Sequence, residues 1–144
     1  IEGCYCMPDA ALKQTLKRLS KQYRYVIVDA PVGLEHLNRR ITETVDDIFD
    51  ILGPSHKSLA NLDRAKRVIR ESGITFSNLY TVGGHLFPEE MEKNLIRSGT
   101  QYLGAIASDP EIARRNMAGE SLLGMDPGSP GPVSVAAILR AAGY

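Results

Sequence analysis

The sequence predicts an α/β fold, with a mainly parallel sheet and flanking helices, from three observations. Short runs rich in β-branched and aromatic residues alternate with amphipathic stretches, as in successive βα units. The length of 144 residues suits one core. The 43% of hydrophobic and 24% of charged residues are typical of a globular chain. We therefore expect residues 1–144 to form a single α/β domain.

The first predicted elements are a helix and a strand. The helix begins at Pro8-Asp9 and ends near Tyr23, because Leu12, Leu16 and Leu19 recur at helical spacing. The apolar run that follows, residues 25–29, is typical of a strand buried on both faces.

Three more strands are predicted at residues 48–52, 78–82 and 102–106. Helices are predicted at residues 37–45, 56–71, 88–97 and 133–142, and another begins at Asp109-Pro110, where Asp109 is the N-cap and Pro110 occupies the first turn. Gly73 is expected to end the helix predicted at residues 56–71. Residues 126–132, rich in proline and glycine, are expected to form a loop.

Right-handed crossovers would make all these strands parallel, so that the loops after them emerge at one edge of the sheet. Ligands of open α/β sheets bind at that edge. A small-molecule site should therefore be built from residues 29–33, 53–55, 83–85 and 107–110.

Charge and composition exclude several classes of protein. The 17 basic and 17 acidic residues cancel, so nothing favours nucleic acid as a partner. No apolar run approaches the ~20 residues that span a bilayer, so no membrane insertion is expected. Two cysteines, Cys4 and Cys6, are too few and too close for a disulfide framework, which favours a reducing, cytoplasmic setting.

The strongest local signal is the apolar run that ends at Asp29 and is followed by Ala30-Pro31-Val32-Gly33. A carboxylate at a strand end can hold the water shell of Mg²⁺ on a nucleoside triphosphate, as a Walker B aspartate does, and Gly33 would let a backbone N–H approach the γ-phosphate. The alternative is that Asp29 caps its own turn.

A phosphate-binding loop does not accompany this signal. No glycine of the chain is followed by lysine, so the G-x-x-x-x-G-K-[ST] motif is missing, and residues 53–58 (GPSHKS) fit a helix N-terminus better. We expect the chain alone to be inactive as an ATPase for that reason.

Cys4 and Cys6 form the second signal, since residues two apart in an extended segment point the same way. Two thiolates are half of a tetrahedral site, and a second copy in a twofold dimer would supply the other half for Zn²⁺ or a softer ion such as Ni²⁺. The alternatives are unreactive thiols or an adventitious disulfide.

Four segments of the chain form a pattern together: residues 3–6 (GCYC), 28–37 (VDAPVGLEHL), 53–59 (GPSHKSL) and 108–112 (SDPEI). This pattern resembles the CooC-type ATPases, which belong to the MinD-like branch of P-loop NTPases and serve in nickel-centre maturation of carbon monoxide dehydrogenase. The resemblance runs from Gly3 to about Leu122 and corresponds to the C-terminal portion of such a protein, without the Walker A strand and loop.

The resemblance implies an ATP-driven homodimer that binds a metal ion through Cys4 and Cys6 at the subunit interface and serves a nickel enzyme such as carbon monoxide dehydrogenase. It implies that Asp29 is the Walker B aspartate with ATP and Mg²⁺, that Gly33 lies in the switch loop, and that Asp109 and Pro110 lie near the nucleotide base. Where the family usually has Asn-Lys, with the Asn recognising adenine, this chain has Gly84-His85.

A second hypothesis is a non-catalytic MinD-like interaction or partitioning module in which the two thiols are incidental. In such folds the P-loop strand lies in the interior of the sheet, so its absence should leave backbone donors and acceptors open along a hydrophobic strand. We therefore expect the chain alone to pair with another copy or to be stabilised by a rearranged neighbour.

Overall fold

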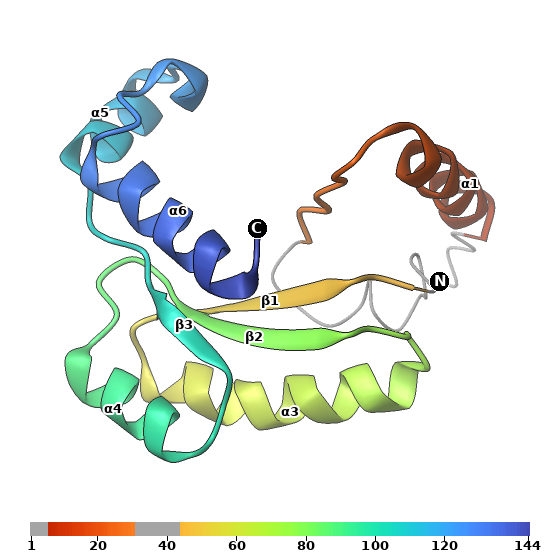
Figure 1. Cartoon of the computed structure of the whole chain (residues 1–144), viewed down its shortest axis with the longest axis horizontal. Helices are drawn as coiled ribbons and strands as arrows, with labels where there is room; N and C mark the ends of the chain where they lie inside the picture. The colour runs from red at the N-terminus through yellow and green to blue at the C-terminus, as the bar shows by residue number, and fades with distance from the viewer. Residues whose placement is uncertain (1–5, 31–43) are drawn as a thin grey trace, which may run out of the picture. The chain divides into compact units, whose positions relative to one another are not determined.

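The structure is a computed structural model that describes residues 6–30 and 44–144, with side chains from residue 10 onward (Figure 1). The chain falls into two compact units. The first comprises Ile1–Asp46 and Asp63–Ser77, and the second comprises Asp47–Leu62 and Asn78–Tyr144.

A parallel sheet of three strands forms the centre of the second unit. The strands are β1 (Asp47–Leu52), β2 (Asn78–Gly83) and β3 (Tyr102–Ala105), in that spatial order. The register of β1 against β2 runs from Asp47 opposite Asn78 to Leu52 opposite Gly83, and β3 pairs with β2 through a register shift between Thr81 and Gly83. The predicted α/β class and parallel pairing are confirmed, as are three of the four predicted strands.

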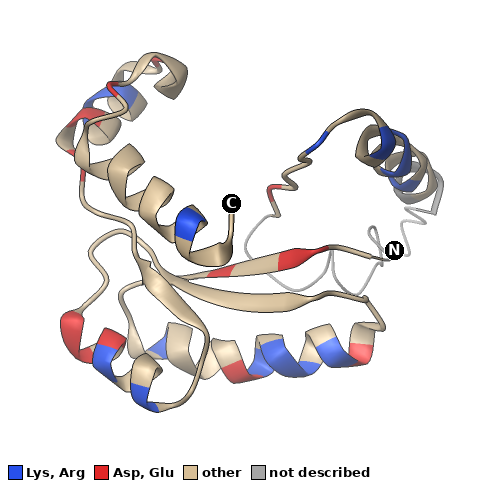
Figure 2. Ribbon diagram, in the orientation of Figure 1, with Lys and Arg blue, Asp and Glu red and all other residues tan. Residues whose placement is uncertain are grey.

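Helices cover both faces of this sheet (Figure 1). On one face, Leu52 of β1 packs with Leu62 and Leu95, which come from α3 (His56–Ser72) and α4 (Glu89–Arg97). On the other face lies α6 (Pro130–Ala142), where Ile138 is buried close to β3. Charged side chains occur along α3 and α4, whereas β2 and β3 carry none, as expected for buried strands (Figure 2).

The C-terminal segment contains α5 (Pro110–Ala118) and a short 3₁₀ helix, η1 (Leu122–Gly124). Asp109 caps α5 and Pro110 occupies its first turn, which confirms the predicted helix start. The predicted loop at residues 126–132 is wrong in its second half, because α6 already begins at Pro130. Prolines fit a first turn since the N–H groups there have no partner within the helix.

In the first unit, α1 (Cys6–Gln22) confirms the predicted N-terminal helix. The predicted strand at residues 25–29 is wrong: the segment is not a strand, and the side chain of Ile27 is 93% exposed. A strand exists only where a neighbour accepts and donates its backbone hydrogen bonds. None of the strands in the described residues pairs with this segment.

The predicted helix at residues 37–45 lies mostly outside the described residues. Its described end is not helical, which corrects the expected C-terminus of that helix. Thr44 forms an isolated parallel bridge with Thr75, and the backbone N–H of Val45 donates to the carbonyl of Thr75 at 3.0 Å. Gly73, with φ of 70°, follows the last residue of α3 as predicted, because a left-handed residue readily ends a helix.

Candidate functional site

The carboxyl ends of β1, β2 and β3 meet at one edge of the sheet, which we call the carboxyl edge. Two backbone hydrogen bonds join the segments that leave it: the N–H of Gly84 donates to the carbonyl of Leu52, and the N–H of Ile106 donates to that of Gly83, both at 2.8 Å. Three of the four predicted edge segments are therefore adjacent, namely residues 53–55, 83–85 and 107–110.

Gly83 and Gly84 are required by close packing at this edge. A Cβ atom on Gly83 would lie 2.7 Å from the ring of Phe87 and 2.9 Å from the Cβ of Ala105. A Cβ atom on Gly84 would lie 2.9 Å from the carbonyl oxygen of Leu52, which is backbone and cannot turn away. A side chain at residue 84 is thus excluded in this arrangement.

A turn after Gly84 presents two exposed side chains at the same edge. The N–H of Phe87 donates to the carbonyl of Gly84 at 3.3 Å, and His85 and Leu86 lie between them. Leu86 has φ of 57°, the left-handed region that side chains with a Cβ atom rarely adopt, and it is 65% exposed.

Asp109 is buried at the end of the segment that follows β3, with 6% of its surface exposed. Its Oδ1 accepts the N–H of Glu111 at 2.9 Å, and its Oδ2 accepts the N–H of Gly131 at 3.0 Å. These donors, Gly131 foremost, hold the pKa of Asp109 below its ordinary value despite burial. The carboxylate therefore joins the N-termini of α5 and α6.

Ser134 of α6 makes a second connection to the same segment. Its hydroxyl accepts the backbone N–H of Ala107 at 3.0 Å and donates to the carbonyl of Gly131 at 2.7 Å. A Cβ atom on Gly131 would lie 2.7 Å from the side-chain end of Ile112 and 3.1 Å from Oδ2 of Asp109, so a larger residue there would displace these two side chains.

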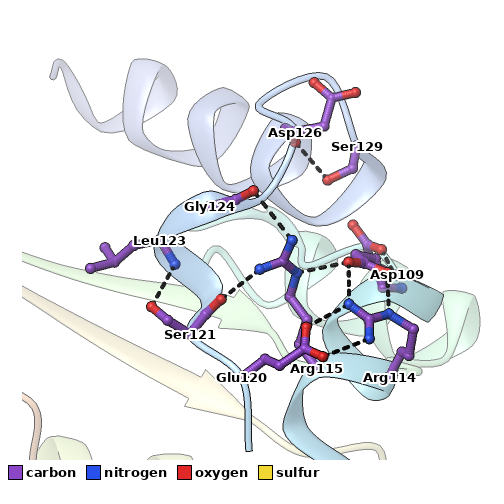
Figure 3. Close-up of polar contacts among 10 residues, drawn as sticks. Asp109, Arg114, Arg115, Glu120, Ser121, Leu123, Gly124, Asp126 and Ser129 are labelled. Atoms are coloured by element: carbon purple, nitrogen blue, oxygen red, sulfur yellow. Dashed lines mark hydrogen bonds and ion pairs between the residues drawn. The ribbon is translucent and has the colours of Figure 1, made fainter. Parts of the chain in front are cut away.

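A network of ion pairs holds α5 against the chain that follows it (Figure 3). Arg114 binds the carboxylates of Glu111 and Glu120 at 2.7–3.0 Å. Arg115 binds Glu111 at 2.7 Å and donates to the carbonyls of Ser121 and Gly124. The guanidinium of Arg114, and then that of Arg115, lower the pKa of Glu111 to about 2. Both arginines thus have partners within the chain.

The predicted site residues are not all placed by the structure. Cys4 and Gly33 lie outside the described residues, and of Cys6 only its backbone, the first residue of α1, is described. Asp29 is exposed in the first unit, whereas Asp109 and Pro110 lie together in the second. The described part of the chain contains no cluster of three or more His, Cys, Asp or Glu side chains that could hold a metal ion.

Sequence reasoning missed three residues that organise this region: Gly131, Ser134 and Arg115. Residues 126–132 are predicted to form a loop, which offers no reason to expect these contacts. The only local signal was proline in a possible first turn at residue 130, because the contacts of these side chains join distant parts of the sequence.

Comparison with known proteins identifies relatives of the chain. No family model matches the chain. It is 33% identical over 120 residues, 81% of its length, to an uncharacterized ATP-binding protein of Methanocaldococcus jannaschii, and 30% identical over 126 residues to a second such protein of that organism. It is 29% identical over 129 residues, 87% of its length, to the carbon monoxide dehydrogenase accessory protein CooC of Rhodospirillum rubrum. The chain is homologous to these CooC-like ATP-binding proteins over most of its length.

The CooC-like chain spans about half the length of the curated relatives it matches, 47% of the first and 48% of CooC. None of its described helices is long and apolar enough to cross a membrane. Its three-stranded parallel sheet with flanking helices is consistent with part of a P-loop NTPase fold.

Proposed function

We propose that this CooC-like chain is part of an ATP-dependent metallochaperone that inserts nickel into an enzyme of the carbon monoxide dehydrogenase type. The observation that carries the proposal is the match, over 81–87% of the chain, to relatives whose names state ATP binding or an accessory role for carbon monoxide dehydrogenase. The parallel sheet supports it, because nucleotides bind outside the carboxyl ends of such strands.

Asp29 is proposed as the Walker B aspartate. Its exposed carboxylate belongs to the class of oxygen ligands that Mg²⁺ takes. Bound Mg²⁺ would offset the negative charge of the terminal phosphates. The carboxylate of Asp109 does not fit such a role, since both of its oxygens accept backbone N–H groups. Gly33 is proposed to lie in the loop that senses the γ-phosphate.

Cys4 and Cys6 are proposed to bind the transported ion together with the same pair from a second copy. Four thiolates satisfy the tetrahedral geometry of Zn²⁺, and thiolates also bind Ni²⁺. ATP can govern release of the ion only if the two states of the dimer bind it with different affinity. The proposal thus requires that ATP changes the metal affinity.

The test uses the full-length protein. It measures ATP hydrolysis, the number of Ni²⁺ and Zn²⁺ ions bound per chain, and the mass of the assembly by sedimentation. Cys4→Ser with Cys6→Ser should abolish stoichiometric metal and weaken the dimer. Asp29→Asn should reduce hydrolysis, whereas Asp63→Asn, which changes an exposed carboxylate on α3, should not.

Equal metal affinity with and without ATP would refute the coupling of nucleotide to metal. Unchanged assembly of the double cysteine variant would instead favour a non-catalytic MinD-like interaction module with incidental thiols.

A further inference from the structure

The end of α5 and the turn after it carry three exposed apolar side chains, Met117, Leu122 and Leu123, which we call the apolar tip. Leu123 is 99% exposed and Met117 is 91% exposed. Single apolar residues are common on protein surfaces, but three between residues 117 and 123 are a local concentration. Exposure to water gives these side chains no role in folding, so their use lies in contact with another molecule.

Polar contacts hold the backbone of the apolar tip in place (Figure 3). Arg115 of α5 donates to the carbonyl of Ser121 at 2.7 Å and to that of Gly124 at 3.3 Å, one on each side of the two leucines. The hydroxyl of Ser121 accepts the N–H of Leu123 at 3.2 Å. In Figure 3 the side chain of Leu123 points away from these contacts. The backbone that carries Leu123 is therefore fixed while its side chain stays in water.

This combination suits Leu123 to be an anchor in a binding contact. Its apolar surface is exposed in the free protein, so burial against a partner removes nearly all of it from water. Its backbone is already ordered, so less conformational freedom is lost on binding than for a leucine on a mobile loop.

The charges of the segment argue against a lipid surface as the partner. Residues 116–139 contain two acidic residues, Glu120 and Asp126, and no lysine, arginine or histidine. Segments that lie on membranes are typically rich in Lys and Arg, which anionic headgroups attract. Glu120 is paired with Arg114, whereas Asp126 is exposed. A complementary partner is a protein surface with an apolar recess and basic groups beside it.

The size of the apolar tip argues against a second copy of the chain as the partner. Each side of a stable protein interface buries about 800 Å², more than three aliphatic side chains supply. Two tips packed against each other would also place Asp126 of both copies at one contact, where like charges repel. A recess, by contrast, adds the area of its own walls around Leu123.

We infer that the apolar tip is a docking contact for the nickel enzyme that the protein serves, with Leu123 entering an apolar recess of that enzyme and Asp126 facing basic groups beside it. The inference rests on the proposed function, because it names the surface that meets the client enzyme. Asp109 caps the N-terminus of α5, whereas the tip lies at the C-terminal end of that helix and beyond it. Docking there leaves the carboxyl edge open to a nucleotide.

The test measures binding of the full-length protein to the carbon monoxide dehydrogenase of its organism, prepared without nickel. Leu123→Ser should weaken binding at least about tenfold, because serine leaves the recess unfilled. ATP hydrolysis and the melting temperature should stay unchanged, since Leu123 is exposed. Leu123→Met keeps an apolar side chain and should bind within about threefold of the unaltered protein. Ile96→Ser is the matched control, because it replaces an exposed apolar side chain on α4 and should not change binding.

Two further variants test the fixed backbone and the charge. Arg115→Lys loses the planar fork that holds the turn, and it should weaken binding about two- to tenfold although Leu123 is still present. Asp126→Asn removes the charge and keeps an oxygen for the N–H of Gly128. It should weaken binding at low salt and match the unaltered protein at high salt, where screening removes the attraction.

The outcomes distinguish this inference from the proposed function. If the unaltered protein does not bind the enzyme, the proposed function fails, and the inference with it. If the unaltered protein binds the enzyme and Leu123→Ser binds it equally well, the inference alone fails. Binding of the unaltered protein, but not of Leu123→Ser, to phosphatidylglycerol vesicles would assign the tip to a lipid surface and overturn the inference. A lower mass of Leu123→Ser in sedimentation would overturn it as well, in favour of a second copy.

Discussion

The backbone of Gly84 lies so close to that of Leu52 that the two residues share a hydrogen bond and residue 84 has no room for a side chain. The N–H of Gly84 donates to the carbonyl of Leu52 at 2.8 Å, and a Cβ atom on Gly84 would lie 2.9 Å from that same oxygen. The end of β2 is thereby fixed against the end of β1, which shapes the carboxyl edge.

Gly84→Ala should therefore lower the free energy of unfolding by about 1–3 kcal/mol, because the strands must separate to admit the methyl group. Urea unfolding monitored by circular dichroism measures this. Gly53→Ala is the control, since a Cβ atom on Gly53 meets nothing within 4 Å, and its effect should stay within about 1 kcal/mol. Equal stability of the two variants would contradict the close approach.

Leu86 adopts a left-handed backbone conformation with φ of 57°. This conformation costs any residue that has a Cβ atom roughly 1–2 kcal/mol of strain, which glycine relieves. Glycine in turn lowers the stability by about 0.5–1 kcal/mol, because its unfolded state has more conformational entropy to lose on folding. Leu86→Gly should accordingly be more stable than Leu86→Ala by about 0.5–1 kcal/mol in thermal unfolding. A more stable alanine variant would show that residue 86 carries no such strain.

Thr81 lies in the middle of β2 with 0% of its surface exposed. Among the described residues, no group accepts or donates a hydrogen bond to its Oγ1. Thr81→Val keeps the shape and removes the unpaired hydroxyl, so unfolding should cost about 1–2 kcal/mol more. Thr81→Ser, which keeps the hydroxyl and loses the methyl group, should be less stable than the wild type. The idea fails if valine destabilises the protein.

Glu111 makes the free energy of unfolding depend on pH below neutrality. Hydrogen bonds from Arg114, and then from Arg115, lower its pKa from 4.5 to about 2 in the folded protein. The unfolded chain therefore takes up the proton first as the pH falls. The stabilisation that the ionised Glu111 provides is complete above pH 4.5 and is lost as the pH falls toward 2.

The difference in melting temperature between the wild type and Glu111→Gln should thus be largest at neutral pH and shrink across this range. Glu89→Gln, in the exposed pair with Lys93, should differ little from the wild type because exposed ion pairs contribute little. A difference for Glu111→Gln that does not change between neutral and acidic pH would refute the assignment.

Arg115 fixes η1 through the carbonyls of Ser121 and Gly124, which need two donors in a planar fork. Arg115→Lys should speed amide hydrogen exchange at Leu123 and Met125, whose N–H groups bond within this turn. Arg114→Lys changes an arginine that binds Glu111 and Glu120, and it should affect these two amides less. Identical exchange in both variants would show that Arg115 does not hold the turn.

Local sequence patterns predicted most of the fold. The strands that became β1, β2 and β3 were recognisable because each is a short run of β-branched, aromatic and apolar residues between turns. The same pattern failed at residues 25–29, where Ile27 is exposed. Apolar composition favours a strand, but pairing requires a neighbouring strand.

The candidate site was predicted less completely than the fold. The N-cap role of Asp109 followed from its place before Pro110, since a cap bonds to a residue two positions away. Its bond to Gly131 did not follow, because no local pattern specifies a partner that far along the chain. The assignments of Cys4, Cys6, Asp29 and Gly33 stay predictions.

The sequence by itself determined the α/β class, the parallel strands and the start of α5, because these follow from periodicity, from the handedness of crossover connections and from contacts within a few residues. The tertiary structure alone decided that Asp109 and Ser134 join the post-β3 segment to α6, and that Gly84 must lack a side chain. Such contacts arise only when separate elements pack together, and packing brings into contact atoms whose positions in the sequence are unrelated.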